Sequence, residues 1–220
     1  MMLQVNERPV GTRLGQEGFA RLTGISRETL DRLGAYVELL RAWNSRINLV
    51  GPNTLGDVWR RHILDSAQLM PLLPGNTRTV IDLGSGAGLP GMVLAVMGVP
   101  VVHLVESDQR KAAFLREAKR VTGAAVDIHA VRAEKVLGIK ADVVVARALA
   151  PVDNLLHIVV PFLGTHSICL FLKGRGMEEE LRDAERGWRM TARITPSRSD
   201  PSGRILRLEN IAPISGAATP

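Results

Sequence analysis

A glycine-rich loop between two apolar runs, VIDLGSGAGLPGMVLA at residues 80–95, constrains the fold of this chain more than any other feature. Gly84, Gly86 and Gly88 occupy alternate positions of that loop. A plain turn from a strand to a helix needs only one glycine, whereas three allow a ligand to approach the backbone closely, because no Cβ intervenes. In an open α/β sheet, ligands bind outside the carboxyl end of a strand. We therefore predict a ligand-binding loop between a first strand and a first helix.

The residues after Gly75 alternate between short β-branched runs and amphipathic segments. Such alternation predicts parallel strands with helices on both faces of the sheet. A turn-rich segment near the end joins two further runs, which predict an antiparallel pair and bring the sheet to seven strands. The predicted strands are 79–83, 101–105, 126–130, 142–146, 167–172, 189–195 and 204–209. The predicted helices among them are 89–97, 108–121, 133–138, 152–162 and 177–187.

The first third of the chain is predicted to be all-helical. Apolar residues of 27–44 recur at the spacing of one helical face, and Ser26 is available as the N-cap. A second helix is predicted over 54–70, with prolines at its end. The predicted organisation is a helical extension at 1–76 packed on an α/β core at 77–210, followed by a flexible tail at 211–220.

Composition limits the classes of protein. The formal net charge of +6 favours an anionic partner, with nucleic acid as the leading candidate. The single Cys169 excludes a disulfide framework, the first twenty residues lack the apolar block of a signal peptide, and no apolar stretch is long enough to span a bilayer. We therefore expect a cytoplasmic protein without a membrane segment. A monomer is the default expectation, and the sequence predicts no metal site.

The loop differs from the fingerprints of two common nucleotide sites. A dinucleotide-binding loop reads G-x-G-x-x-G, but the third glycine position is Leu89 here, and the chain has no P-loop motif. Glu106 ends the second predicted strand, where a carboxylate can accept hydrogen bonds from both hydroxyls of a ribose; it can also favour the dipole of the helix that follows. A ligand with a ribose and no requirement for a phosphate cradle fits S-adenosylmethionine.

At these residues the chain resembles a Rossmann-like class I methyltransferase. Further motifs are similar to those of the bacterial small-subunit ribosomal RNA guanine-N7 methyltransferase G family, also called glucose-inhibited division protein B. The resemblance covers about residues 35–209. It rests on VWRRHILDS (58–66), GSGAGLPG (84–91), VRAE (131–134), ARALAP (146–151) and LKG (172–174).

The resemblance implies that S-adenosylmethionine is the cofactor and that small-subunit ribosomal RNA, or the ribosomal subunit, is the partner. By this resemblance Gly84 and Leu89 contact the cofactor, as do Ala133 and Glu134 after the third strand. Gly86, Gly88 and Glu106 join them as expected cofactor-binding residues. Glu134 also fits a solvated acid at the start of a helix.

Arg147 directly follows the fourth predicted strand and is our candidate catalytic residue. Its guanidinium is expected to hold the cofactor, the target base or a flanking phosphate. A surface salt bridge is the alternative. His62 and Asp65 share a helix face, and we interpret them as a structural polar pair that clamps the N-terminal helices to the sheet. The expected RNA-binding cations are Arg60, Arg61, Lys173, Arg175 and Arg204.

The sequence also restricts the chemistry. Cys169 lies within an apolar strand and is expected to be an inert core thiol, which disfavours a mechanism through a cysteine nucleophile. Guanine N7 carries a free lone pair, so methyl transfer to it needs no general base, and placement of the reactants would supply the catalysis. Two alternatives stay open: a methyltransferase of another RNA, a small molecule or a protein, and a non-catalytic RNA-binding or ribosome-assembly module. A nicotinamide-dependent dehydrogenase is third, disfavoured by Leu89.

Overall fold

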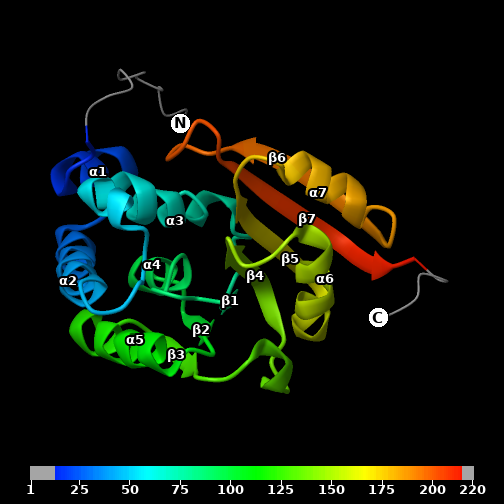
Figure 1. The fold of residues 1–220 in the computed structure, drawn as a ribbon, viewed down its shortest axis with the longest axis horizontal. Helices are drawn as coiled ribbons and strands as arrows, with labels where there is room; N and C mark the ends of the chain where they lie inside the picture. Colours follow the sequence, from blue (N-terminus) through cyan, green and yellow to red (C-terminus); the bar gives the residue numbers. More distant parts are fainter. Residues whose placement is uncertain (1–12, 215–220) are drawn as a thin grey trace.

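The computed structural model describes residues 13–214, which form a seven-stranded sheet with helices on both faces (Figure 1). The strand order is β3-β2-β1-β4-β5-β7-β6. Strands β1 to β5 run parallel, and β7 lies antiparallel between β5 and β6. The strands are β1 (Thr79–Leu83), β2 (Val101–Val105), β3 (Val126–His129), β4 (Ala141–Arg147), β5 (Leu163–Lys173), β6 (Trp188–Pro196) and β7 (Arg204–Pro213). The predicted sheet of seven strands, mostly parallel with an antiparallel pair at the end of the chain, is confirmed.

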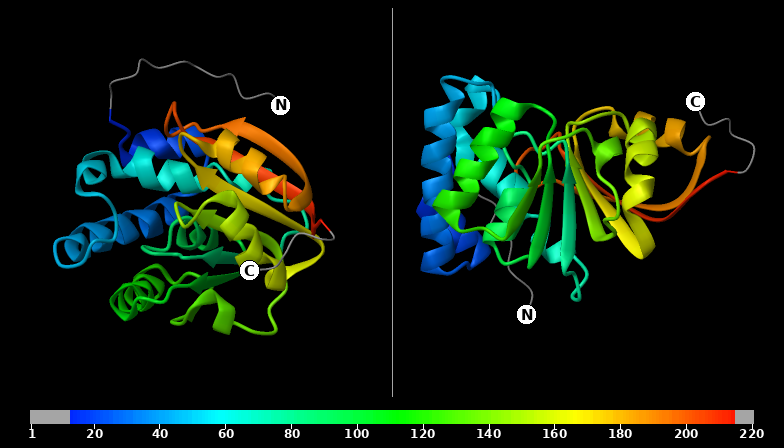
Figure 2. Two further views of the ribbon diagram at one scale, coloured as in Figure 1. Left: turned by 45° about the vertical axis from the view of Figure 1, so that its right-hand side comes forward. Right: turned by 90° about the horizontal axis from the view of Figure 1, so that it is seen from below.

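The helices fall into two layers, seen on either side of the strands in Figure 2. The α-helices are α1 (Gln16–Thr23), α2 (Arg27–Asn44), α3 (Asp65–Ala67), α4 (Gly91–Val96), α5 (Gln109–Thr122), α6 (Val152–Val159) and α7 (Met177–Ala184). The shorter or irregular helices are η1 (Pro52–Asp57), η2 (Trp59–Leu64), η3 (Met70–Leu72), η4 (Ala133–Lys135) and η5 (Val160–Phe162). No helix in residues 13–214 is long and apolar enough to cross a membrane.

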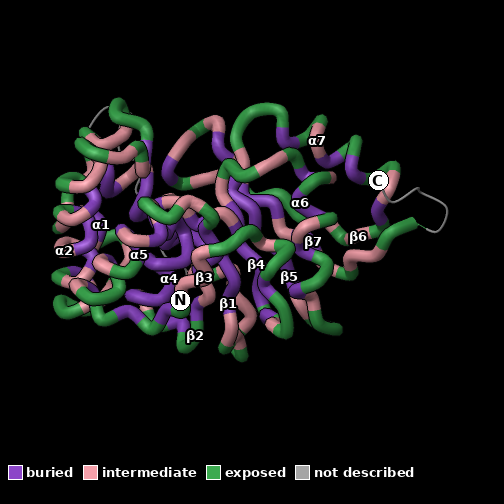
Figure 3. The backbone as a smooth tube through the Cα atoms, turned by 60° about the horizontal axis from the view of Figure 1, so that its bottom comes forward, coloured by how far each residue is buried: buried purple, intermediate pink, exposed green. Residues whose placement is uncertain are grey.

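Alternate residues of each central strand enter two separate hydrophobic clusters, which explains the layers. In β4, Val143 and Val145 pack with the N-terminal helices, α4 and α5, whereas Val144 and Ala146 pack with α6 and α7. This is the period of two that a strand imposes on its side chains. Figure 3 shows the central strands as largely buried. Because both faces are covered, these strands read as continuous apolar runs in the sequence.

The N-terminal helices share one cluster with the α4 and α5 side of the sheet. Helix α2 begins and ends as predicted, and the Ser26 side chain accepts a hydrogen bond from the Thr29 N–H. Trp43 packs edge-on against Phe114 of α5, with ring centroids 5.7 Å apart. Helix α1 lies in the region for which the sequence predicted only helical character.

Three predicted segments differ from the structure. The helix predicted over 54–70 is divided into η1, a π-helix (η2), the short α3 and η3. The helix predicted over 133–138 is one 3-10 turn, because Val136 is extended and Gly138 has a left-handed φ of 75°. Strand β7 continues to Pro213, which pairs with Trp188, so residues 211–213 are not part of a flexible tail. Residues 215–220 of that tail, and residues 1–12 of the extension, lie outside the described residues.

Asp82 is a buried carboxyl group in the middle of β1. Its side chain accepts a hydrogen bond from the Gly91 N–H at 2.8 Å, and Oδ1 has no partner. A Cβ at Gly91 would approach this carboxyl group to 2.8 Å, so only glycine allows α4 to begin so close to β1. Burial raises the pKa of Asp82 to about 7. The folded chain therefore binds a proton here more tightly than the unfolded chain does.

We expect Asp82→Asn to change how stability depends on pH. With the pKa raised to about 7 from 3.8, wild-type stability should fall as the pH rises from about 4 to about 7. The variant has no carboxyl group at this position and lacks this loss. The difference in unfolding free energy between the variant and the wild type should therefore change by roughly 2–4 kcal/mol in favour of the variant across that window. Urea denaturation at a series of pH values measures the difference.

Asp200→Asn is the matched control. The side-chain hydrogen bond from Arg61 lowers the pKa of Asp200 to about 2, so its stabilising contribution is lost only as the pH falls below about 4. A constant difference between wild type and Asp82→Asn from pH 4 to 8 would contradict the assignment.

Candidate functional site

The glycine loop turns directly after β1 in a left-handed backbone conformation. Gly84, Gly86 and Gly88 have φ values of 66°, 57° and 83°. A Cβ at Gly86 would meet only the Gly84 carbonyl oxygen, at 3.8 Å, so this part of the backbone is open to a ligand. A Cβ at Gly88 would lie 2.9 Å from the Met92 Cβ, and Gly88 is therefore required for packing on α4.

Glu106 braces this loop from the end of β2. One carboxylate oxygen accepts a hydrogen bond from the Gly86 N–H at 2.9 Å, and the other accepts one from the Asp108 N–H at 2.8 Å. The residue is only 7% exposed. Each oxygen keeps a second lone pair, so the group can hold the loop and still accept from a ligand hydroxyl. The sequence predicted the second role and missed the first.

Tyr36 of α2 also holds the loop, a contact that was not predicted from the sequence. Its hydroxyl donates a hydrogen bond of 2.6 Å to the Ala87 carbonyl oxygen, across 51 residues of sequence. The side chain is fully buried, and burial raises the pKa of its hydroxyl. Tyr36 is the only tyrosine of the chain and lies on the apolar face of α2 next to Val37, which is the signal that was available.

A cleft of about 420 Å³ opens in front of the loop, within the range of small-molecule sites. The predicted residues among its lining are Gly84, Gly86, Leu89, Arg147, Arg61, Lys173 and Arg204. The predicted residues outside the lining are Gly88, Glu106, Ala133, Glu134, Arg60 and Arg175. Elements on both sides of β1 thus meet at the carboxyl ends of the strands, as the topology requires.

Arg147 is held at the end of β4 by two residues of the irregular helical segment. Its guanidinium donates to His62 Nδ1 at 2.9 Å and lies 3.5 Å from an Asp65 carboxylate oxygen. His62 and Asp65, predicted only to clamp the N-terminal helices to the sheet, also position the candidate catalytic Arg147. The Asp65 N–H reaches back to the Arg60 carbonyl through the wide π-helical turn, a feature frequent at functional sites and invisible in apolar spacing.

His62 is neutral in this arrangement. Burial and the nearby Arg147 charge lower the pKa of His62 to about 3. Because Arg147 has only donors, Nδ1 must be the acceptor, and Nε2 then donates to the Thr54 hydroxyl at 2.7 Å. Both ring nitrogens are engaged, so His62 has no free lone pair with which to act as a base.

The loop 197–203 between β6 and β7 forms one wall of the cleft and is tied to the same helical segment. The Ser199 hydroxyl donates to Asp65, and the Arg198 N–H donates to the Gln68 side-chain oxygen at 2.7 Å. Arg61 forms an ion pair with Asp200 of this loop. The guanidinium of Arg61, one of the expected RNA-binding cations, is thus already paired with a carboxylate of the chain.

The other expected RNA-binding cations are also engaged or lie away from the cleft. Lys173 is 7% exposed, pairs with Glu180 at 2.6 Å and donates to the Ala150 carbonyl oxygen. That burial argues against the predicted phosphate contact. Arg204 donates to the carbonyl oxygens of Pro201 and Gly203, and Arg60 pairs with Asp57 at 3.5 Å.

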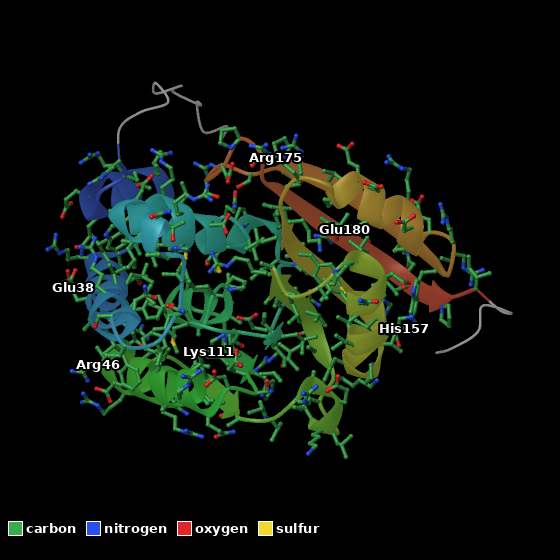
Figure 4. All side chains as sticks on the ribbon, viewed as in Figure 1. Glu38, Arg46, Lys111, His157, Arg175 and Glu180 are labelled. Carbon is green, nitrogen blue, oxygen red and sulfur yellow. The ribbon has the colours of Figure 1, made fainter. Side chains whose placement is uncertain are left out.

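Arg175 is exposed in the turn before α7 (Figure 4), outside the cleft lining. The 3-10 turn that carries Ala133 and Glu134 also does not reach the cleft, and Glu134 is exposed. Cys169 is fully buried in β5, and burial raises the pKa of its thiol, so the inert core thiol is confirmed. Within residues 13–214, no cluster of three or more His, Cys, Asp or Glu side chains is arranged to hold a metal ion.

Comparison with protein families gives a match over most of the chain. The family model described as GidB, rRNA small subunit methyltransferase G, matches residues 29–199. A protein named Ribosomal RNA small subunit methyltransferase G from Rhodospirillum centenum is 58% identical over 195 residues, covering 89% of this chain and 90% of the relative. A protein of the same name from Paramagnetospirillum magneticum is 54% identical, covering 90% and 97%.

Solved structures with low sequence identity share the fold. The M. jannaschii TYW2 structure in complex with AdoMet is similar with a TM-score of 0.54 and 14% identity, covering 77% of this chain and 80% of that one. A mutant of MtNAS in complex with S-adenosylmethionine gives a TM-score of 0.55 at 15% identity, covering 89% and 84%. At these identities the likeness shows the Rossmann-like fold alone.

We expect Tyr36→Phe to loosen the loop. The change leaves the buried Ala87 carbonyl oxygen without its donor, which costs about 1–3 kcal/mol of unfolding free energy. Affinity for a ligand of the loop should fall several-fold, measured by calorimetry with S-adenosylhomocysteine. Thr122→Val is the control, because it removes another buried hydroxyl hydrogen bond, to Ala118 at the far end of α5. Equal ligand affinity in both variants would contradict a role for Tyr36 in holding the loop.

Proposed function

The chain belongs to the rRNA small subunit methyltransferase G family, and on this premise we propose that it methylates guanine N7 of small-subunit (16S) ribosomal RNA with S-adenosylmethionine as methyl donor. The observation that carries the proposal is the braced glycine loop facing the cleft in a chain of this family. Left-handed glycines, an open backbone at Gly86 and a strand-end carboxylate suit a ribose-containing ligand without a phosphate cradle.

The residues present fit this cofactor. Gly84, Gly86 and Leu89 line the cleft and are proposed to contact it, and Glu106 has lone pairs left for the ribose hydroxyls. Gly88 lies outside the cleft lining, and its role is to let the loop pack closely on α4. Ala133 and Glu134 retain their proposed place beside the adenine, which rests on the family resemblance. The cofactor supplies an electrophilic methyl group on a sulfonium.

Methyl transfer to guanine N7 requires the chain to place the cofactor and the base relative to each other. Guanine N7 has its own lone pair, so no proton must leave before the methyl group is accepted. Consistent with this, both His62 nitrogens are engaged, and an Asp65 oxygen accepts from Ser199 and Gln68. Arg147, fixed at the carboxyl end of β4, is proposed to orient the cofactor and the base for in-line transfer.

The site of action follows from the substrate. We propose that the protein acts as a monomer in the cytoplasm, where ribosomal subunits are assembled. Arg60, Arg61 and Arg204 lie along the β6–β7 wall or the irregular helical segment, and they are proposed to contact RNA at the rim in addition to their contacts within the chain. Sedimentation of the pure protein tests the oligomeric state, and a dimer would contradict it.

Methyl transfer tests the function directly. The purified protein should transfer labelled methyl groups from S-adenosylmethionine to small-subunit RNA taken from a strain that lacks this protein. Mapping should place the labelled methyl groups on N7 of a guanine. S-adenosylhomocysteine should raise the Tm through mass action, and NAD should not. Incorporation into metabolites or protein instead of RNA would support the alternative substrates. RNA binding without affinity for S-adenosylhomocysteine would support the non-catalytic module.

Arg147→Ala should lower kcat/KM by roughly 100-fold, because a misplaced reactant costs about that much. Arg147→Lys should rescue little, since Lys keeps the charge but lacks the planar fork that serves His62 and Asp65 together. Circular dichroism confirms that each variant is folded. Wild-type rates in Arg147→Ala would refute the assigned role.

A further inference from the structure

A second hollow, of about 310 Å³, adjoins the cleft, and its residues were not among the predicted sites. It is lined by Arg46, Ile47, Asn48, Asp108, Arg110 and Lys111. Lys111 lines both hollows, so they are neighbours at that residue. Figure 4 labels Arg46 just past the end of α2 and Lys111 on α5, and these two elements pack together.

Two cations of this hollow have no partner. Among residues 13–214, the side chains of Arg46 and Lys111 form no hydrogen bond and no ion pair. Arg46 is exposed and Lys111 is half-buried. By contrast, Arg61, Arg147 and Lys173 in the main cleft all pair with carboxylates of the chain. Among the described residues, Arg46 and Lys111 are therefore two cations beside the cleft whose charge no carboxylate of the chain neutralises.

The one carboxylate in the hollow is already neutralised. Asp108 accepts hydrogen bonds from the Arg110 and Lys111 N–H groups, and its carboxylate pairs with the Arg110 guanidinium at 3.1 Å. The side-chain hydrogen bond from Arg110 lowers the pKa of Asp108 to about 2, so it stays charged and paired. Three cations face one carboxylate, and the hollow as a whole attracts an anion.

An oxyanion with several acceptor oxygens suits this donor set. Arg46 presents a fork of N–H donors, Lys111 an ammonium group, and Asn48 an exposed amide with no partner among the described residues. The hollow is open to solvent at the edge of the cleft, where a polynucleotide backbone continuing from a base in the cleft would pass. Cations that position a nucleic acid without reading its sequence contact its phosphates.

We propose that the Arg46–Lys111 hollow binds a backbone phosphate of the RNA that flanks the nucleotide in the cleft. The inference rests on the proposed function, because it takes RNA as the substrate. It assigns the phosphate contact to residues from the end of α2 and the start of α5, which were not among the RNA-binding cations expected from the sequence.

Charge-neutralising variants test the site. Arg46→Gln, Lys111→Gln and the double variant are compared with Arg189→Gln, which removes another exposed cation without a partner among the described residues, on β6 at the opposite edge of the sheet. Binding to a 16S ribosomal RNA transcript is measured by filter retention between about 50 and 200 mM KCl. Affinity for S-adenosylhomocysteine is measured by calorimetry on the same proteins.

The double variant should bind the transcript about 10-fold more weakly at low salt, and its salt slope, the change in log K with log [KCl], should be smaller by about one. Arg189→Gln should leave RNA affinity unchanged, and Arg46→Gln, whose side chain lies outside the lining of the main cleft, should leave S-adenosylhomocysteine affinity unchanged. Equal losses in the double variant and Arg189→Gln would overturn the site, as would weaker S-adenosylhomocysteine binding in Lys111→Gln with unchanged RNA affinity. If the wild type does not methylate small-subunit RNA, the proposed function fails, independently of these variants.

Discussion

The hydrogen bonds that hold the glycine loop are the constraint on which the site depends. A run of left-handed glycines has little conformational preference of its own, so other elements must fix it. Glu106 at the end of β2 and Tyr36 of α2 both hydrogen bond to this loop, at Gly86 and Ala87. The main-chain bond from Ser85 to Val105 adds a third connection. The N-terminal helices thus help to shape the loop at the cleft, although the glycine motif itself lies in the α/β core.

A polar cluster organises the other half of the cleft. His62, Asp65 and Arg147 bring the irregular helical segment to the end of β4, and Asp65 continues the contacts to the β6–β7 loop. The network is partly buried, with His62 its most buried member, and breaking it leaves desolvated polar groups without partners. The π-helical turn supplies the local geometry that aims both His62 and Asp65 at one guanidinium. The same contacts engage both ring nitrogens of His62, which leaves it unable to act as a general base and suits a nucleophile that has no proton to lose.

The positive charge of the chain is distributed by these contacts. The cations expected near the cleft are largely committed to carboxylates or carbonyl oxygens of the protein, where they shape the walls. Arg46 and Lys111 are separate in sequence and, among the described residues, free of such contacts. A count of cations therefore points correctly to an anionic partner without showing which side chains meet it. Which cationic side chains stay available to such a partner is decided by their ion pairs and hydrogen bonds within the fold.

The sequence by itself determined the elements whose cause is local. Short β-branched runs defined the strands, a regular apolar face with a serine cap defined α2, and alternate glycines marked the loop at the cleft. The parallel character of the first five strands and the antiparallel pair at the end followed from the same pattern, whereas the strand order came from the structure. The tertiary structure decided what depends on groups distant in sequence: the π-helical turn at 59–64, the extension of β7 to Pro213, the Tyr36 contact and the pairing state of each cation. These features are set by hydrogen bonds and ion pairs across tens of residues, and no local pattern of residue types encodes which partner a polar side chain will find.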